Sequence, residues 1–345
     1  MKQLFFVVIL LLFIGCSDKP DFIEYECLAP QEIKLDRIKL EKEILYCDNI
    51  YAYDNKLIIL NTKNKNGFLS LYSLDDFKYL GDCGIIGKGP NEFDFINTNA
   101  TALGYCGINI TESISYSSID ITMENQNPSI EKKEIVRLPN RYSAANSLLM
   151  LSDSTTIIYM NNNENVEFYI HNRCDKTTKP ISYYPKYFVN GGRPSSTVCS
   201  TLFLNDLCIN TTDNRFAAIY SQLPMVRIFE NTGVLRSTSL LKKWRKQHFN
   251  FNKNEVMTSE NIQYYLASCA NNNYICGLYL GKSPDDMQDT NMEDVRMELH
   301  VWNWDGELVA IYLPDKLINH IALSNDNTLY AVSLLDDKNI YKYKL

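Results

Sequence analysis

A Gly- and Pro-rich segment, GIIGKGPNEF from Gly84 to Phe93, is the first place where side chains could bind a ligand. Its glycines and proline predict a rigid, irregular turn, after which Glu92 and Phe93 stand near a surface loop. The segment is not a phosphate-binding loop, because it lacks the GK[ST] sequence and no helix is predicted after it. Two interpretations stay open. Either Glu92 and Phe93 contact a ligand, or Glu92 accepts backbone N–H groups while Phe93 packs between neighbouring elements.

Two arginines and a tyrosine form a second candidate group. Arg141 and Tyr142 follow a Pro-Asn pair, and Arg193 lies in the sequence NGGRP. The guanidinium group presents a planar fork of donors that matches carboxylate and sulfate oxygens. We therefore predict that Arg141, Tyr142 and Arg193, together with Glu92 and Phe93, bind an anionic or sugar-like group. Solvated loop arginines are the alternative.

The sequence offers no recognisable catalytic or metal-binding motif. It contains no GxSxG nucleophile turn and no CxxC pair, and its four histidines are scattered. The acidic segment Lys282–Asp294 lacks the spacing of an EF-hand, so it predicts a solvated loop rather than a calcium site. We expect no catalytic residues, no metal and no cofactor, although folding could still pair two carboxylates.

The N-terminus has the features of an export signal with a lipid-attachment site. Lys2 precedes an unbroken apolar stretch, Leu4–Ile14, whose 11 residues are too few to span a bilayer. The stretch ends in FIGC, which resembles a bacterial lipobox. Residues 1–15 are therefore predicted to be a signal peptide, Cys16 to carry acyl chains such as palmitate, and residues 16–30 to form a tether. The alternative is an ordinary signal peptide that contains a cysteine.

Charge and cysteine content restrict the partners further. The net charge of −7 at pH 7 argues against binding to nucleic acid or to anionic lipid. Nine cysteines follow the anchor. Cys269 and Cys276 could face each other across a hairpin, and buried free thiols are the alternative for most of the nine.

The elements that must position these residues are short strands arranged in a repeat. The segments 225–240 and 298–313 align at an offset of 73 residues, so that Phe229 falls on Trp302, Gly233 on Gly306 and Leu235 on Leu308. Gly306 follows an aspartate between apolar residues, a strong hairpin signal. One hairpin that recurs far along the chain indicates a repeat architecture.

Six strand–turn–strand units recur at intervals of 48 to 60 residues. Each fits a blade of four strands, except that the sixth unit ends one strand short. The segment Glu32–Leu40 can supply that strand, with a bulge near Asp36-Arg37 to correct its apolar alternation. The sequence thus predicts an all-β six-bladed propeller over residues 31–345, closed by an N-terminal strand; a β-sandwich is the alternative.

Together, the repeat, the lipobox and the run GxGPxEF at Gly87–Phe93 resemble TolB-like six-bladed propeller lipoproteins of Bacteroides-like bacteria. The resemblance implies a propeller in the bacterial cell envelope, from a family largely without assigned activity. We expect a non-enzymatic binding or scaffold module, anchored in the outer membrane through Cys16 and facing the periplasm or the exterior. An envelope protein or a glycan is the expected partner, and nucleic acid is not. A glycan-active propeller enzyme, a lyase or glycosidase, is the alternative if the channel pairs two carboxylates or a His and a Tyr.

Overall fold

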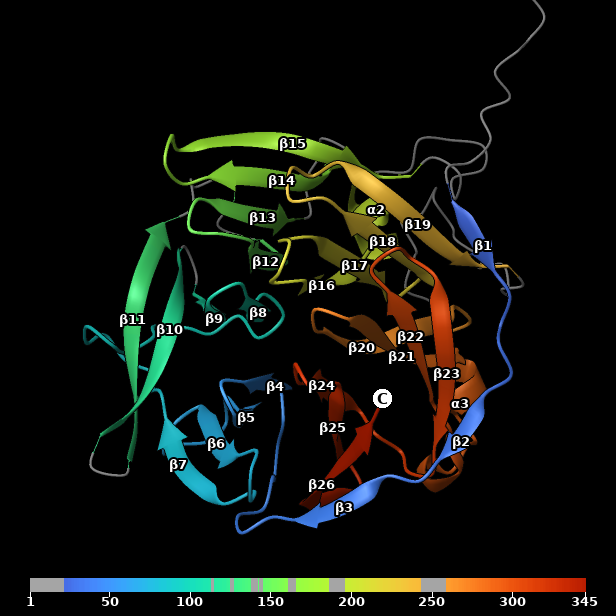
Figure 1. Cartoon of the computed structure of the whole chain (residues 1–345), viewed down its shortest axis with the longest axis horizontal. Coiled ribbons are helices and arrows are strands. Elements are labelled where there is room, and N and C mark those ends of the chain that lie inside the picture. Colours follow the sequence, from blue (N-terminus) through green and yellow to red (C-terminus); the bar gives the residue numbers. More distant parts are fainter. Residues whose placement is uncertain are drawn as a thin grey trace, which may run out of the picture.

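Six antiparallel sheets stand around a common axis in the computed structural model (Figure 1), which describes residues 22–112, 115–124, 127–137, 142, 145–160, 166–185, 196–242 and 259–345. Each sheet is one blade of a propeller, with its first strand innermost. The predicted all-β fold with six four-stranded blades is therefore confirmed.

The strands of the blades follow one another in chain order. Blade one contains β4 (Asn49–Tyr53), β5 (Lys56–Leu60), β6 (Leu69–Ser73) and β7 (Tyr79–Cys83), and blade two β8 (Ala102–Gly104), β9 (Gly107–Thr111), β10 (Ser115–Glu124) and β11 (Asn127–Arg137). Blade three contains β12 (Ser147–Met150), β13 (Thr155–Tyr159), β14 (Val166–Asn172) and β15 (Thr177–Tyr183), and blade four β16 (Asn205–Ile209), β17 (Phe216–Tyr220), β18 (Met225–Phe229) and β19 (Leu235–Leu241). Blade five contains β20 (Gln263–Ala270), β21 (Tyr274–Lys282), β22 (Glu298–Asn303) and β23 (Leu308–Pro314), and blade six β24 (His320–Leu323), β25 (Thr328–Ser333) and β26 (Asp336–Lys344). The described helices are α2 (Ser196–Leu202), α3 (Pro284–Met287) and the 3-10 turn η5 (Met292–Asp294).

Turn residues with left-handed backbones set the strand pairing. Asp54 and Asn55 both have positive φ, which gives the β4–β5 hairpin the right twist for its strands. The two aligned hairpins are alike in the structure: Phe229 pairs with Leu235, Trp302 pairs with Leu308, and the glycine between has φ of 85° in one and 88° in the other. The repeat read from the sequence is therefore confirmed.

Blade six is completed by the N-terminal segment. Strand β3 (Asp36–Lys39) pairs antiparallel with β26, and Ile38 lies opposite Ile340. The predicted ring closure is confirmed. Before it, β2 (Gln31–Ile33) pairs parallel with β23, and β1 (Ile23–Tyr25) pairs parallel with β19. Residues 22–40, which we call the strap, thus run along the outer edges of blades four, five and six (Figure 1).

The strap differs from the sequence prediction in two ways. The apolar alternation changes between Leu35 and Ile38 because the chain leaves blade five after Ile33 and joins blade six at Asp36, not because of a bulge. The Leu35 N–H donates to Asp315 Oδ1 at 3.0 Å, which fixes the crossing. In addition, residues 16–30 were assigned to a tether, but Tyr25 within them is buried in the core.

The core lies between neighbouring blades. Phe216 and Phe229 stack at 4.7 Å, and Phe168 of the preceding blade meets Phe216 edge-on at 5.8 Å. At the same interface Arg227 forms a buried ion pair with Glu167, which also accepts a hydrogen bond from Tyr220. The two adjacent blades are therefore held by both aromatic packing and a buried charge pair.

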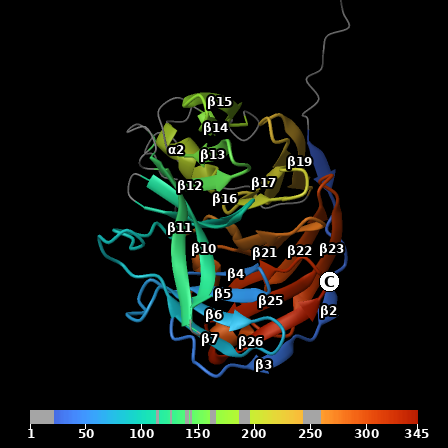
Figure 2. The ribbon, with the colours of Figure 1, turned by 60° about the vertical axis from the view of Figure 1, so that its left-hand side comes forward.

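The antiparallel blades give the ring two distinct ends. We call the end at which each inner strand begins the entry face. It carries the connections from each outer strand to the next inner strand, and also those from second to third strands. The opposite end is the exit face. The long hairpin of β10 and β11 projects along the side of the ring (Figure 2). No helix in the described ranges is both long and apolar enough to cross a membrane.

Candidate binding face and central channel

The loop Gly84–Phe93 lies on the entry face and is braced by its own glutamate. Glu92 Oε2 accepts the Gly89 N–H at 2.7 Å. A Cβ at Gly87 would come within 2.1 Å of the same oxygen, and one at Gly89 within 2.9 Å of the Glu92 carboxyl carbon. Both glycines therefore leave room for the Glu92 side chain, and Glu92 serves the loop itself.

Phe93 and Tyr142 lie in the core. Phe93 is fully buried and meets Phe68 edge-on at 5.1 Å, with Lys132 Nζ 4.0 Å from its ring centroid. Tyr142 is 3% exposed and packs 5.2 Å from Tyr169. In this structure both rings fill gaps between blades, where no ligand reaches them.

Of the remaining predicted residues, Arg141, Arg193 and Cys16 lie outside the described residues. The ligand-binding role of Arg141 and Arg193 and the lipidation of Cys16 stay predictions.

Large apolar side chains gather on the entry face around blades six, one and two. Their exposed fractions run from 37% for Tyr46 to 78% for Leu45. We call this set the apolar rim; its members are Leu45, Tyr46, Ile85, Ile86, Phe95, Leu334 and Leu335.

The rim residues come from adjoining loops. The Ile44 N–H donates to the Asp337 carbonyl at 2.6 Å, which ties the β3–β4 connection to the start of β26, next to Leu334 and Leu335. The Lys63 Nζ lies 3.6 Å from the Tyr46 ring centroid, which joins the same connection to the β5–β6 loop. On the exit face the described large apolar residues that are exposed are Tyr53, Met123, Val234 and Val309, each from a different blade. The rim is therefore a feature of one end of the ring.

Blade five adds an acidic loop to the same face. Between β21 and β22, α3 and η5 present exposed carboxylates; the exposed acidic residues are Asp285, Asp286, Asp289, Glu293 and Asp294. Ser283 caps α3 by accepting the Asp286 N–H at 3.2 Å, so the loop has a defined conformation. In the part of the chain that the structure describes, no three His, Cys, Asp or Glu side chains are arranged to hold a metal ion.

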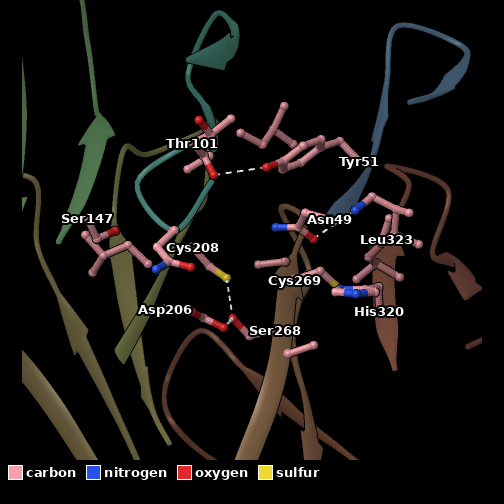
Figure 3. A pocket seen from close by; sticks show the side chains of 18 of the residues that line it. Asn49, Tyr51, Thr101, Ser147, Asp206, Cys208, Ser268, Cys269, His320 and Leu323 are labelled. Atoms are coloured by element: carbon pink, nitrogen blue, oxygen red, sulfur yellow. Dashed lines mark hydrogen bonds between the residues drawn. The ribbon is translucent and has the colours of Figure 1, made fainter. Parts of the chain in front are cut away.

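A cavity of about 280 Å³ follows the central axis between the inner strands (Figure 3). Polar residues line it where the inner strands begin: Asn49, Ser147 and His320 are the first residues of β4, β12 and β24. All six inner strands contribute to the wall. The channel is thus a polar site assembled from the whole ring.

Asp206 is a carboxylate in this wall that has few protein partners. Its carboxylate Oδ2 accepts a hydrogen bond from Ser268 Oγ at 3.3 Å, and Ser268 also lies 3.5 Å from Cys208 Sγ (Figure 3). No described residue forms an ion pair with it. Asp206 is open to the channel, and the inner strands of all six blades lie around that channel. The resulting desolvation raises the pKa of Asp206 to about 6.

The other channel groups that could do chemistry are held by internal contacts. Asp48 Oδ2 accepts both the Thr62 N–H at 2.8 Å and the Thr62 hydroxyl at 2.7 Å. The Tyr51 hydroxyl donates to the Thr101 carbonyl at 3.0 Å. Burial lowers the pKa of His320, so this imidazole is neutral at pH 7. Asp206, with one hydrogen bond from Ser268, is therefore less committed to protein donors than Asp48, which accepts two from Thr62.

A ring of six radial four-stranded sheets around an open channel defines a six-bladed β-propeller. The chain belongs to the TolB-like propeller family: residues 38–326 match the family described as TolB-like 6-blade propeller-like. No protein among the curated ones matches the chain.

Two solved structures are similar in fold. A member of the DUF4221 family from Bacteroides vulgatus has a TM-score of 0.59 and 11% identity, with 90% of this chain and 96% of that chain covered. A Bacteroides fragilis protein whose name marks it as a candidate for export has a TM-score of 0.52 and 12% identity, with 93% and 98% covered. At these identities the likeness establishes the fold alone.

The sequence prediction missed Asp206 and the apolar rim. A signal for Asp206 was present, because a carboxylate directly precedes the three apolar residues of strand β16, NDLCI. The rim had a weaker signal in the paired apolar residues Ile85-Ile86 and Leu334-Leu335, each within a turn. Turn segments normally carry polar residues, so such pairs indicate a contact surface.

Proposed function

We propose that this chain is a non-enzymatic binding module of the bacterial cell envelope. It is anchored in the outer membrane through acylated Cys16, and it docks a partner protein on its entry face. The observation that carries the proposal is the apolar rim. Single exposed apolar residues are common, but seven on neighbouring loops of one face are typical of an interaction site.

The acidic loop of blade five favours a partner with basic residues, while Lys63 and Lys65 add positive charge beside Ile85 and Ile86. The five carboxylates of the blade-five loop lie on the same face, and the chain has a net charge of −7 at pH 7. Anionic lipid and nucleic acid are repelled by such a surface, whereas a protein segment with lysine or arginine among apolar residues complements it. The name of the Bacteroides fragilis neighbour, which refers to export, agrees with a place in the envelope.

The channel supports binding over glycan cleavage. Glycosidases need two carboxyl groups about 5–9.5 Å apart that are both free to act on the substrate. Here Asp48 accepts two hydrogen bonds from Thr62, and the Tyr51 hydroxyl is committed to a backbone carbonyl. A cavity of about 280 Å³ is also just below the usual range of about 300–1,000 Å³ for drug-sized ligands, so it favours a single small group over a sugar chain.

Site-specific photo-crosslinking in cells tests the docking face. A crosslinking residue at Ile85 should trap a partner protein that the same residue at Val234, on the exit face, does not trap. The trapped protein is then purified, and its affinity is measured for the wild type, for Ile85→Ser with Ile86→Ser, and for Val234→Ser.

The rim variant should bind at least about tenfold more weakly than the wild type, while Val234→Ser binds normally. All three proteins should melt alike, because the substituted side chains are more than half exposed. Equal affinity for wild type and rim variant would place the docking surface elsewhere.

A further inference from the structure

We infer that the central channel receives one basic side chain, a lysine or an arginine, from the docked partner, with Asp206 as its counter-charge. The inference rests on the proposed docking and adds the chemical class of the group bound.

The geometry places in the channel wall a carboxylate, Asp206, that has no ion-pair partner among the described residues; the second carboxylate of the wall, Asp48, is held by Thr62. Asp206 is the second residue of β16 and faces the cavity of about 280 Å³. The side chain that donates a hydrogen bond to it, Ser268, is neutral, and the described residues supply no cation within ion-pair distance of Asp206. Because the protein around the channel is a poor solvent for charge, an ammonium or guanidinium group is attracted there more strongly than at an open surface.

The channel wall also suits the stem of a basic side chain. Leu266 is 39% exposed and lines the cavity together with Ala267, Ala322 and Leu323. Lysine and arginine lay their methylene groups along apolar surface while the charged end reaches a polar group. The hydroxyl of Ser147 and the amide of Asn49 line the same cavity and offer acceptors for the remaining N–H donors.

Other ligand classes fit less well. A bound anion would face the Asp206 charge directly. A calcium ion takes six to eight oxygen ligands, and among the described side chains no three acidic, His or Cys groups converge on one point. A side chain with several N–H donors needs only the single carboxylate and the neutral acceptors that the wall provides.

Binding should weaken in acid. The titratable side chains that line the channel are Asp48, Tyr51, Asp206, Cys208, Cys269 and His320. Burial lowers the pKa of His320 and raises that of Cys208 to about 12, so both are neutral at pH 7. Asp206, with a pKa of about 6, loses its charge as the pH falls below that value. Affinity for a basic group should therefore be full above about pH 7 and decline below about pH 6.

The experiment measures binding of small probes to the purified full-length protein in detergent. The probes are Nα-acetyl-lysine methylamide and Nα-acetyl-arginine methylamide; the Nε-acetylated lysine analogue, which has no charge, is the matched control. Each is titrated by calorimetry into the wild type, Asp206→Asn and Asp153→Asn, an exposed aspartate on the exit face.

We expect both charged probes to bind the wild type and Asp153→Asn equally, and to bind Asp206→Asn at least about tenfold more weakly. Equal binding of the acetylated analogue, or normal binding to Asp206→Asn, would overturn the inference. Ile85→Ser with Ile86→Ser should leave probe binding unchanged. Failure of docking and failure of the channel site are thereby distinguished, because only the first depends on the rim. A melting curve of Asp206→Asn confirms that this isosteric variant is folded.

Discussion

At the scale of single residues, Gly87 and Gly89 are required by a neighbouring side chain rather than by their own backbone angles. Neither has positive φ. Instead the Glu92 carboxylate occupies the space that a Cβ would take, and it accepts the Gly89 N–H at 2.7 Å. The GxGPxEF run is thus a unit in which two glycines make room for one acid, and it positions Ile85 and Ile86 on the surface.

A Gly87→Ala substitution should destabilise this loop. The new Cβ would force the flexible carboxylate away and break its hydrogen bond, at a cost of about 1–3 kcal/mol in the free energy of unfolding. Glu92→Ala should cost a similar amount. The double variant should cost little more than either single variant, because both substitutions remove the same hydrogen bond. Urea unfolding measures all three.

The control for this series is Lys88→Ala, an exposed position between the two glycines, which should stay within about 0.5 kcal/mol of the wild type. Additive losses from Gly87→Ala and Glu92→Ala would show that the two residues act independently.

At this scale the sequence could identify an irregular loop, but it could not predict which side chains of the loop are exposed. It left open whether Glu92 and Phe93 brace the loop or contact a ligand, and the hydrogen bond of Glu92 and the burial of Phe93 fit the first interpretation. Phe95, only two residues on, is 54% exposed. An irregular loop has no periodicity, so nothing in the sequence separates a ring that points inward from one that points out.

At the scale of elements, the strap joins three blades through short strands. Its side chains Tyr25, Ile33, Leu35 and Leu40 are each less than 9% exposed. The Tyr25 hydroxyl lies 3.0 Å from that of Tyr265, so β1 contributes a polar contact as well as an apolar one.

Removal of the strap should abolish cooperative unfolding. Burial of each large apolar side chain contributes about 1.5–3 kcal/mol, against a total stability of about 5–15 kcal/mol. A variant that begins at Glu41 loses four such side chains and exposes the edge of β26. Circular dichroism during heating should show a broad, non-cooperative transition.

A variant that begins at Phe22 is the matched control, and it should melt like the mature protein. A sharp transition at the parent temperature for the chain beginning at Glu41 would exclude β3 as the strand that closes the ring.

Local signals in the sequence were sufficient for the blades but not for the strap. Hairpins such as β4–β5 pair neighbouring segments, so turn residues and alternation identify them. Strands β1 and β2 are three residues long and pair with segments more than 200 residues away. No turn marks such pairs, and the change of phase between Leu35 and Ile38 was therefore assigned to a bulge. The channel could not be predicted for the same reason, because Asp206 and Ser268 are far apart in the sequence and meet only when the ring closes.

At the scale of the whole molecule, the proposed lipid on Cys16 would determine where the propeller works. Phe22, the first described residue, is six positions after Cys16. Six residues span at most about 22 Å, so a lipid on Cys16 would keep the edge of blade four near the bilayer surface. That placement would leave both faces of the ring accessible.

Lipidation is tested by Cys16→Ser. We expect labelled palmitate to enter the wild type and not the variant, and the variant to leave the membrane fraction. Ser17→Ala is the control for a change beside the cysteine. Equal membrane retention of Cys16→Ser and the wild type would rule out anchoring through this residue.

The order of the strap strands has a mechanical consequence. A force applied at Phe22 reaches the β1–β19 pair first, the β2–β23 pair second and the β3–β26 pair last. The three strand pairs are loaded in series, so the hydrogen bonds of one pair must break before the next pair carries the force. A membrane that pulls on its tethered protein would therefore peel two outer strands before any tension reached the strand that keeps the ring closed.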